Sequence, residues 1–300
     1  MGRRAISGSL TRALKKARVF LCLTGIKPCF KISFNTMDDK KKREKTDYII
    51  QSVVHALDIL ESFRDIKGDQ GVTELAGRLK LHKNNVFRLL ATLETRGYIE
   101  QDRLTGNYRL GVKTFEMGQA FIAQTGLFKQ ARPVMDGLVR ECNETVYVAV
   151  LRGDRVVYLD IAETTHSVRV ANRVGTLLPA YCTAVGKAQL AYMSEAELDG
   201  ILARPRLQGY TKNTITEKDR LKAHLKEVAR KGYALDLEEL EPDVFCIGVP
   251  IMDHTGRTVA GMCVSGPGSR MGKRRMETEL MPLVKAAGAA VSRKLGYNAE

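Results

Sequence analysis

The sequence predicts an α+β protein built from two folded parts, and three observations support this prediction. Short amphipathic helices followed by a candidate β-hairpin occupy residues 47–110. Residues 127–298 alternate helices with runs typical of antiparallel hairpins, and a further helix over 111–126 links the two parts. The chain has 300 residues, 44% hydrophobic and 27% charged, which is a globular composition and a length sufficient for two domains.

The first part begins with an amphipathic helix near residue 47. Val53, Leu57, Leu60 and Phe63 recur at helical spacing and form its expected apolar stripe. The segment GDQG interrupts this helix. The short helix VTELAGRLK follows, and Thr73 is a suitable N-cap for it.

A third helix, KNNVFRLLATLETRG, starts after a tight connection at Leu81–His82 and stops at Gly97. Its expected apolar stripe is Val86, Leu89, Leu90 and Leu93. The segment YIEQDRLTGNYRLG then indicates strand, turn and strand, with the turn at Thr105–Asn107. A helix, a helix-turn-helix and a hairpin in this order predict a winged helix-turn-helix.

The polar side of the third helix carries side chains suited to DNA. The first residues of such a helix face the major groove, where Asn pairs with adenine and Arg with guanine. Thr92 and Thr95 lie further along the helix, near phosphate, while the hairpin arginines approach the backbone or the minor groove. A polar face is usually only solvated, but the adjoining hairpin favours DNA. The candidate DNA-binding residues are His82, Lys83, Asn84, Asn85, Arg88, Thr92, Arg103 and Arg109.

The second part is expected to combine one sheet with several helices. Its strand-like runs are TVYVAVLRG and RVVYLDIAET, joined by a turn at Gly153–Asp154, and then YALDL, VFCIGVPIMD and TVAGMCVSG. Its helices are FKQARPVMDGLVREC, TAVGKAQLAYM, SEAELDGILA, TEKDRLKAHLKEVARKG and a final one over 273–295. Ser194 and Glu197 form a capping box, and Thr216 and Gly232 delimit the fourth helix.

Two segments of the second part suit a ligand. Small residues over Thr183–Ala188 start a helix whose free N–H groups favour an anion, with Lys187 adding charge. A tight helix start that allows close packing explains the same pattern equally well. Asp236 ends a strand beside Glu238, Glu239 and Glu241, where one inward carboxylate would accept a ligand hydroxyl, although acidic clusters are usually solvated.

Strand alternation assigns faces to the last two strands. Cys246, Gly248 and Pro250 share one face, and Cys263 and Ser265 share a face of the next strand. A cysteine in such a position is more often a small core residue than a nucleophile.

Charge and cysteine spacing exclude several classes of protein. Of the net charge of +14, residues 1–46 hold +10, and they are interpreted as a disordered basic extension, with Met37 as a plausible start. The mildly basic remainder does not by itself indicate nucleic acid. The six cysteines are scattered without metal-ligand spacing, so reduced thiols in a cytoplasmic protein are expected, and neither a structural zinc site nor a cofactor. No apolar run is long enough for a membrane helix.

Nearly all of residues 47–298 resemble the IclR family of bacterial transcriptional regulators. The resemblance rests on QSVVHALDILESF, on LHKNNVFRLLATLETRGYIEQDRLTGNYRLG, on GTLLPAYCTAVGKAQLA and on the stretch from GYALDLEEL to VSGP. It implies a winged helix-turn-helix, a linker helix and a GAF-like, mixed α/β effector-binding domain. It also implies homodimers formed through the DNA-binding half, further pairing into homotetramers, and effectors that are small carboxylates or aromatic acids.

The resemblance also implies a set of effector contacts by matching position. These are Ala184, Val185, Asp236, Cys246, Cys263 and Ser265. The family often has Ser where Cys263 stands, which removes a hydroxyl donor and argues against a small hydrophilic effector. It tends to have Ser-Thr at Asn84 and Asn85, so a different operator sequence is expected.

The sequence therefore predicts a cytoplasmic regulator that binds double-stranded operator DNA, responds to a small-molecule effector and is not an enzyme. The first alternative is an enzyme that uses Cys246 or Cys263 as a nucleophile, for which His254 is the one nearby base. The second is an architectural DNA-binding protein whose second domain is only structural.

Overall fold

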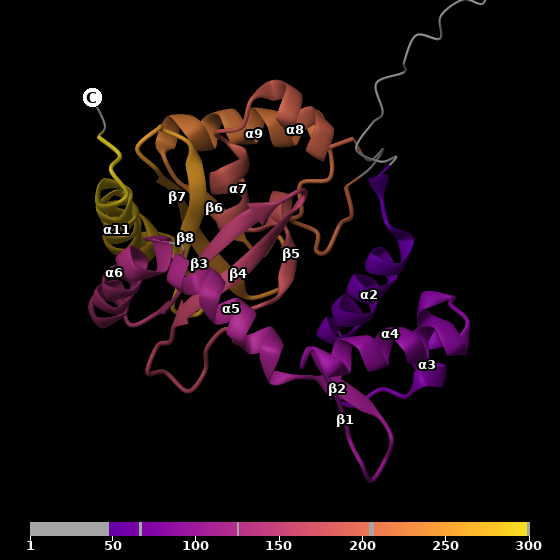
Figure 1. Ribbon diagram of the computed structural model, residues 1–300. Helices are drawn as coiled ribbons and strands as arrows, with labels where there is room; N and C mark the ends of the chain where they lie inside the picture. Colours follow the sequence, from indigo (N-terminus) through magenta and orange to yellow (C-terminus); the bar gives the residue numbers. More distant parts are fainter. Residues whose placement is uncertain (1–47, 66–67, 125, 204–206, 299–300) are drawn as a thin grey trace, which may run out of the picture. The chain divides into compact units, whose positions relative to one another are not determined.

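The computed structural model describes residues 48–65, 68–124, 126–203 and 207–298, and the basic extension expected over 1–46 lies outside them (Figure 1). The chain divides into two units after Glu61, and each is described by itself.

Helix α2, Gln51–Ser62, carries two apolar faces rather than one. Ile59 is buried, whereas Val53 and Leu57 are each 52% exposed. The prediction that Val53 and Leu57 face the core is therefore wrong. Helical spacing identifies an apolar stripe but does not say which of two stripes a helix buries.

Helices α3, Val72–Leu79, and α4, Lys83–Thr95, form the helix-turn-helix. Leu75, Val86 and Leu90 are buried, as the apolar pattern predicts. The N-cap of α3 is Gly71 and not Thr73, which lies inside the helix. The N–H of Gly71 donates to Glu74 Oε2 at 3.0 Å, so the glutamate side chain caps the helix where Gly71 offers no hydroxyl.

Strands β1, Ile99–Gln101, and β2, Tyr108–Leu110, pair antiparallel as the predicted hairpin. Asp102 organises the turn, since its Oδ1 accepts the N–H groups of Leu104 at 2.9 Å and Thr105 at 2.8 Å. These hydrogen bonds favour the ionised carboxylate and lower the pKa of Asp102. Helix α5, Val112–Gln124, follows β2.

A six-stranded sheet in the order β5-β4-β3-β8-β7-β6 forms the centre of the second part (Figure 1). All neighbouring strands are antiparallel. The predicted strands are β3, Thr145–Arg152, β4, Arg155–Ala162, β6, Ala234–Leu237, β7, Val244–Met252, and β8, Thr258–Pro267. Strand β5, Leu177–Pro179, was not predicted because three residues ending in proline carry no alternation.

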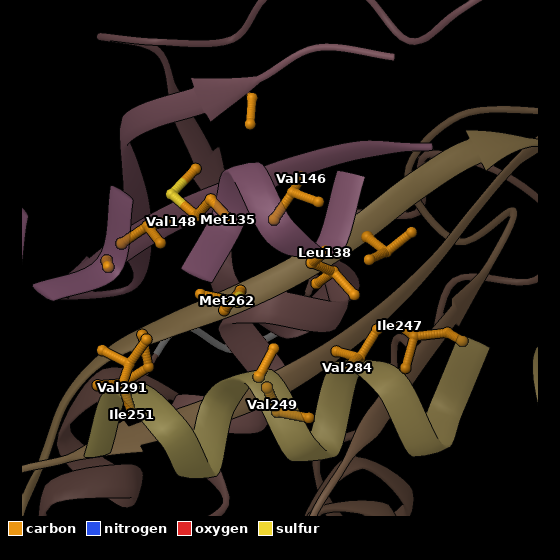
Figure 2. Close-up of a cluster of buried hydrophobic side chains, with 14 of the residues drawn as sticks. Met135, Leu138, Val146, Val148, Ile247, Val249, Ile251, Met262, Val284 and Val291 are labelled. Carbon is orange, nitrogen blue, oxygen red and sulfur yellow. The ribbon is translucent and has the colours of Figure 1, made fainter. Parts of the chain in front are cut away.

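Helices α6, Gly126–Cys142, and α11, Met281–Lys294, cover one face of the sheet. Figure 2 shows their side chains, among them Met135 and Val284, meeting inward residues of β3, β7 and β8. The last helix was predicted unbroken, but it comprises α10, Lys273–Arg275, a π-helical turn, Met276–Leu280, and α11. Pro282, which has no N–H to donate, follows the π turn.

The other face is covered by η3, Ala180–Cys182, α7, Ala184–Leu190, α8, Glu195–Ile201, and α9, Lys218–Lys231. The predicted capping box of Ser194 and Glu197 is present. Gly232, with φ +76°, ends α9 as predicted. Thr216 is not its N-cap, because Glu217 holds that position without a side-chain hydrogen bond.

Every residue of α7 is buried, and the helix lies directly on strands β7 and β8. A Cβ added at Gly248 of β7 would lie 2.5 Å from the carbonyl of Ala184. A Cβ at Gly261 of β8 would lie 2.7 Å from Val185 Cγ2. The two glycines therefore allow the close approach of helix and sheet.

Replacing Gly248 by alanine is expected to lower the free energy of unfolding by about 1–3 kcal/mol, because the new methyl group meets rigid backbone. Gly200 is the matched control: it lies in α8, where an added Cβ meets nothing within 4 Å. Gly200→Ala should leave stability equal or raise it by up to about 1 kcal/mol. Urea unfolding measures both variants. Equal stabilities would show that α7 is not packed on β7 as described.

Candidate functional site

The eight predicted DNA-binding residues are all exposed in the structure. His82 is the N-cap of α4, and Lys83, Asn84 and Asn85 form its first turn. Because Val86 and Leu90 point into the core, the side of α4 that carries Asn84, Asn85 and Arg88 faces solvent. The structure thus presents these side chains on one accessible helical surface. The remaining three are Thr92, further along α4, and the hairpin residues Arg103 and Arg109.

Two of these predicted contacts have partners within the chain. The Thr92 hydroxyl donates to Arg88 O at 2.8 Å, so it must leave the helix backbone before it can donate to phosphate. Arg109 Nε lies 3.5 Å from Glu100 Oε2 across the hairpin, and the two side chains form an exposed ion pair. Such a pair contributes little and is readily exchanged for a phosphate.

A second group of polar residues forms a row across the sheet. Strand register aligns Thr145 of β3 with Ser265 of β8, Ser265 with Cys246 of β7, and Cys246 with Asp236 of β6. Directly opposite residues have their side chains on the same face. Asp236, Cys246 and Ser265, which were singled out from sequence, therefore lie together. We call these three residues and Thr145 the polar row.

The polar row contains one internal hydrogen bond and one hydroxyl group without a hydrogen-bond partner. Ser265 Oγ donates to Cys246 Sγ at 3.1 Å, and Cys263 Sγ lies 3.9 Å from Ser265 Oγ. Thr145 Oγ1 is buried and has no hydrogen-bond partner among the described residues. Cys246 is the one member of the polar row that is partly exposed. A buried polar atom without a partner is costly, which favours a polar ligand or water at this position.

Asp236 is buried, and burial raises its pKa to about 7 even though Lys187 favours the charged form. Its Oδ1 accepts the N–H of Glu239 at 2.8 Å. Lys187, completely buried on α7, forms an ion pair with Glu239. The sequence was compatible with an ion pair between Lys187 and a ligand anion. In the structure, the Glu239 carboxylate of the same chain is the partner of Lys187.

Ala184 and Val185 form the first turn of α7 and are buried against β7 and β8. Their backbone N–H groups belong to a helix start, where no carbonyl of the same helix accepts them. Thr183 caps this turn, since its Oγ1 accepts the N–H of Gly186 at 3.2 Å. These two residues therefore offer backbone donors rather than side chains.

Sequence reasoning missed Thr145 and Arg173. Alternation along β3 was sufficient to place Thr145 opposite Ser265 once the strands were paired. Arg173 lies in the irregular segment between β4 and β5, which carries no periodic signal. Beside them, the Tyr147 and Tyr158 rings pack edge to face with centroids 5.3 Å apart.

The described residues contain no group of three or more His, Cys, Asp or Glu side chains that could hold a metal ion. In the same residues, no helix is long and apolar enough to cross a membrane.

Two family profiles match this chain. The IclR helix-turn-helix domain matches residues 52–103, and the domain described as bacterial transcriptional regulator IclR C-terminal matches residues 119–293. The chain belongs to the IclR family.

Relatives of known function support the same assignment. The HTH-type transcriptional regulator XynR of Escherichia coli (strain K12) is 33% identical over 251 residues, covering 84% of this chain and 99% of XynR. The regulator KdgR of the same strain is 32% identical, covering 83% of this chain and 94% of KdgR. The Thermotoga maritima IclR structure has a TM-score of 0.66 at 32% identity, covering 82% of this chain and 99% of that one. An IclR regulator from Alicyclobacillus acidocaldarius has a TM-score of 0.74 at 28% identity, covering 82% and 99%.

The chain is thus a transcriptional regulator with an N-terminal helix-turn-helix domain that binds DNA and a C-terminal domain that binds a small-molecule effector. The family and the α+β fold predicted from sequence are confirmed.

No support emerges for the cysteine-dependent enzyme. Burial raises the pKa of Cys263 to about 12 and that of Cys246 well above its usual range, so both thiols stay protonated. His254 lies beyond Met252, at the opposite end of β7 from Cys246, a separation of roughly 20 Å along a strand. It therefore does not serve Cys246 as a base.

Replacing Asp236 by asparagine is expected to stabilise this regulator at pH 8 and to have little effect near pH 4. The pKa of Asp236 is about 7 in the folded chain against 3.8 for an ordinary Asp, so the folded state binds this proton more tightly than the unfolded state. Stability therefore falls as pH rises from 4 to 7, by an amount on the order of 4 kcal/mol, and Asn abolishes that loss.

Urea unfolding at several pH values between 4 and 8 measures the effect. Asp253→Asn is the control, because hydrogen bonds from Thr255 lower the pKa of this exposed carboxyl and give the opposite dependence. A stability difference for Asp236→Asn that does not change with pH would contradict the assignment.

Proposed function

We propose that this IclR-family regulator reads its operator with α4 and the β1–β2 hairpin and binds a small organic or aromatic acid at the polar row. The proposed divisions are a DNA-binding domain over 47–110, a linker over 111–126 and a GAF-like effector domain over 127–298. The effector contacts are Ala184, Val185, Asp236, Cys246, Cys263 and Ser265. The unpartnered Thr145 Oγ1, buried at one end of a row in which Cys246 is partly exposed, is the observation that carries the effector site.

Regulation then follows from two arrangements of the paired DNA-binding domains. The effector shifts the equilibrium between them by its difference in affinity for the two. Operator half-sites would be spaced about one helical turn, ~34 Å, or a multiple of it. No catalytic residue and no cofactor belong to this mechanism, and the regulator acts in the cytoplasm.

The proposed assembly is a homodimer, with homotetramers as a further step. Large apolar side chains are exposed in both units, and in water such groups favour burial against another chain. Operators read by two recognition helices call for a second copy of the same chain. In the first unit these side chains are Tyr48, Ile49, Ile50, Val53 and Leu57; on α5 they are Val112, Phe115, Met117 and Phe121.

The experiment that tests the function combines two measurements on the intact regulator. Footprinting of DNA from its neighbouring genes locates the operator. Fluorescence anisotropy of that operator, with and without organic acids, then measures the response. An acid that shifts operator affinity supports the proposal. A protected operator whose affinity no acid changes, together with no thermal stabilisation by any acid, favours the architectural alternative.

Arg88→Ala is expected to weaken binding to the operator by about 1–3 kcal/mol, because a guanidinium that pairs with guanine is lost. Its affinity for random DNA should change much less. Arg230→Ala is the control, since Arg230 is exposed on α9 and pairs with Glu227. Equal losses on operator and random DNA would show that Arg88 contacts phosphate rather than a base.

Leu57→Glu is expected to convert the dimer to a monomer of half the mass in light scattering, because a charge would enter the apolar contact between copies. Leu57 is half-exposed, so the fold should tolerate the change. Glu61→Gln, at an exposed position one turn further along α2, serves as the control. An unchanged dimer would place the contact elsewhere.

A further inference from the structure

We propose that Arg173 anchors the carboxylate of the effector and that Glu241 occupies its guanidinium until the effector arrives. This inference rests on the effector site proposed above. It adds a charge anchor and a competitor within the chain, two roles that the sequence motifs did not assign to any residue.

Arg173 is held in a fixed position at the edge of the site. Its carbonyl accepts the hydroxyl of Thr176 at 2.6 Å and the N–H of Thr176 at 2.9 Å. The N–H of Gly175 donates to Tyr158 O at 2.8 Å, which ties this turn to β4. The side chain of Arg173 is only 13% exposed. Little conformational freedom thus remains to be lost when a ligand binds.

The segment that carries Arg173 lies against the strand that carries Thr145. The Tyr147 hydroxyl donates to Ala171 O at 2.7 Å, and Tyr147 lies two residues from Thr145, on the same face of β3. Burial is the main cause of the raised pKa of both Cys246 and Cys263, and the positive charge of Arg173 opposes it at both thiols. Burial likewise dominates at Asp236, where Arg173 again favours the anion. A charge that acts on all three groups lies close to them. An acid bound to Arg173 would therefore reach the polar row.

Arg173 is also a cation whose hydrogen-bonding capacity is only partly used. Lys187 is already paired with Glu239. Among the described residues, the polar contact of the Arg173 guanidinium is a single one, from Nη2 to Glu241 Oε2 at 2.7 Å. A guanidinium offers five N–H donors and binds a carboxylate best through two parallel hydrogen bonds. The internal pair leaves that capacity unused.

Glu241 has the properties of a replaceable partner. It lies on the connection between β6 and β7, and its side chain is 50% exposed. A half-exposed carboxylate returns to water at little cost. A small acid would take the guanidinium and release Glu241. Binding of the acid is therefore a competition within the chain, and removal of Glu241 should strengthen it.

The test measures thermal stabilisation of the full chain by acetate, pyruvate and benzoate, with acetamide, pyruvamide and benzamide as uncharged counterparts at equal ionic strength. Glu241→Gln should lower the apparent Kd for at least one acid about fivefold to tenfold. Arg173→Gln should remove the preference for acid over amide, whereas Arg173→Lys, which keeps the charge but not the two parallel hydrogen bonds, should only weaken it. Glu163→Gln is the matched control, because Glu163 forms an exposed pair with Arg169 at 3.9 Å.

The outcomes separate the anchor from the proposed function. If an acid stabilises wild type and all variants equally, the effector site stands and Arg173 is not its anchor. If Glu241→Gln weakens acid binding, the ion pair supports the site rather than competing for it, and the inference is overturned. If none of the acids stabilises even Glu241→Gln, the anchor is rejected, while operator binding by α4 remains open to its own test.

Discussion

The close contact between α7 and two strands of the sheet is the constraint on which the effector domain depends. It requires no side chain at Gly248 and Gly261, because Ala184 and Val185 lie where those side chains would be. The helix is consequently buried along its whole length. Its first turn lies against Gly248, two residues along β7 from Cys246 of the polar row.

That packing also determines the electrostatics of the site. Lys187 has no access to solvent and must take its counter-ion from the chain, which Glu239 supplies. Asp236 is left buried with a raised pKa and a single backbone donor from Glu239. The site therefore contains a carboxyl group that exchanges its proton near neutral pH and, in Arg173, a cation held only by a half-exposed partner. In the proposed mode of binding, an acid would enter this site by charge exchange rather than by burial of a new charge.

Patterns that repeat along the chain were predictable, and contacts between distant segments were not. Periodicity predicted α4 and the side that it exposes, and alternation grouped Cys246 with Gly248 on one face of β7 and Cys263 with Ser265 on one face of β8. Local chemistry predicted the Ser194 capping box and the end of α9 at Gly232.

The predictions of Thr73 and Thr216 as N-caps failed because the two helices begin at other residues. The first residue of a helix depends on which backbone N–H groups find hydrogen-bond partners. Arg173 lies in a segment without periodicity, and its role depends on Glu241, 68 positions away. The exposed Val53 and Leu57 failed for another reason, since helical spacing identifies an apolar stripe but not which stripe the helix buries.

The account requires that small molecules reach the polar row while the surrounding core stays closed. Modification of the native protein by methyl methanethiosulfonate at pH 9, followed by peptide mapping, tests this directly. Cys246 is partly exposed, whereas Cys142, Cys182 and Cys263 are buried. The account predicts that Cys246 is modified before Cys263, a thiol of the same region whose pKa is also raised by burial. Modification of Cys246 no faster than that of Cys263 would show that the row is sealed, and would contradict an effector site there.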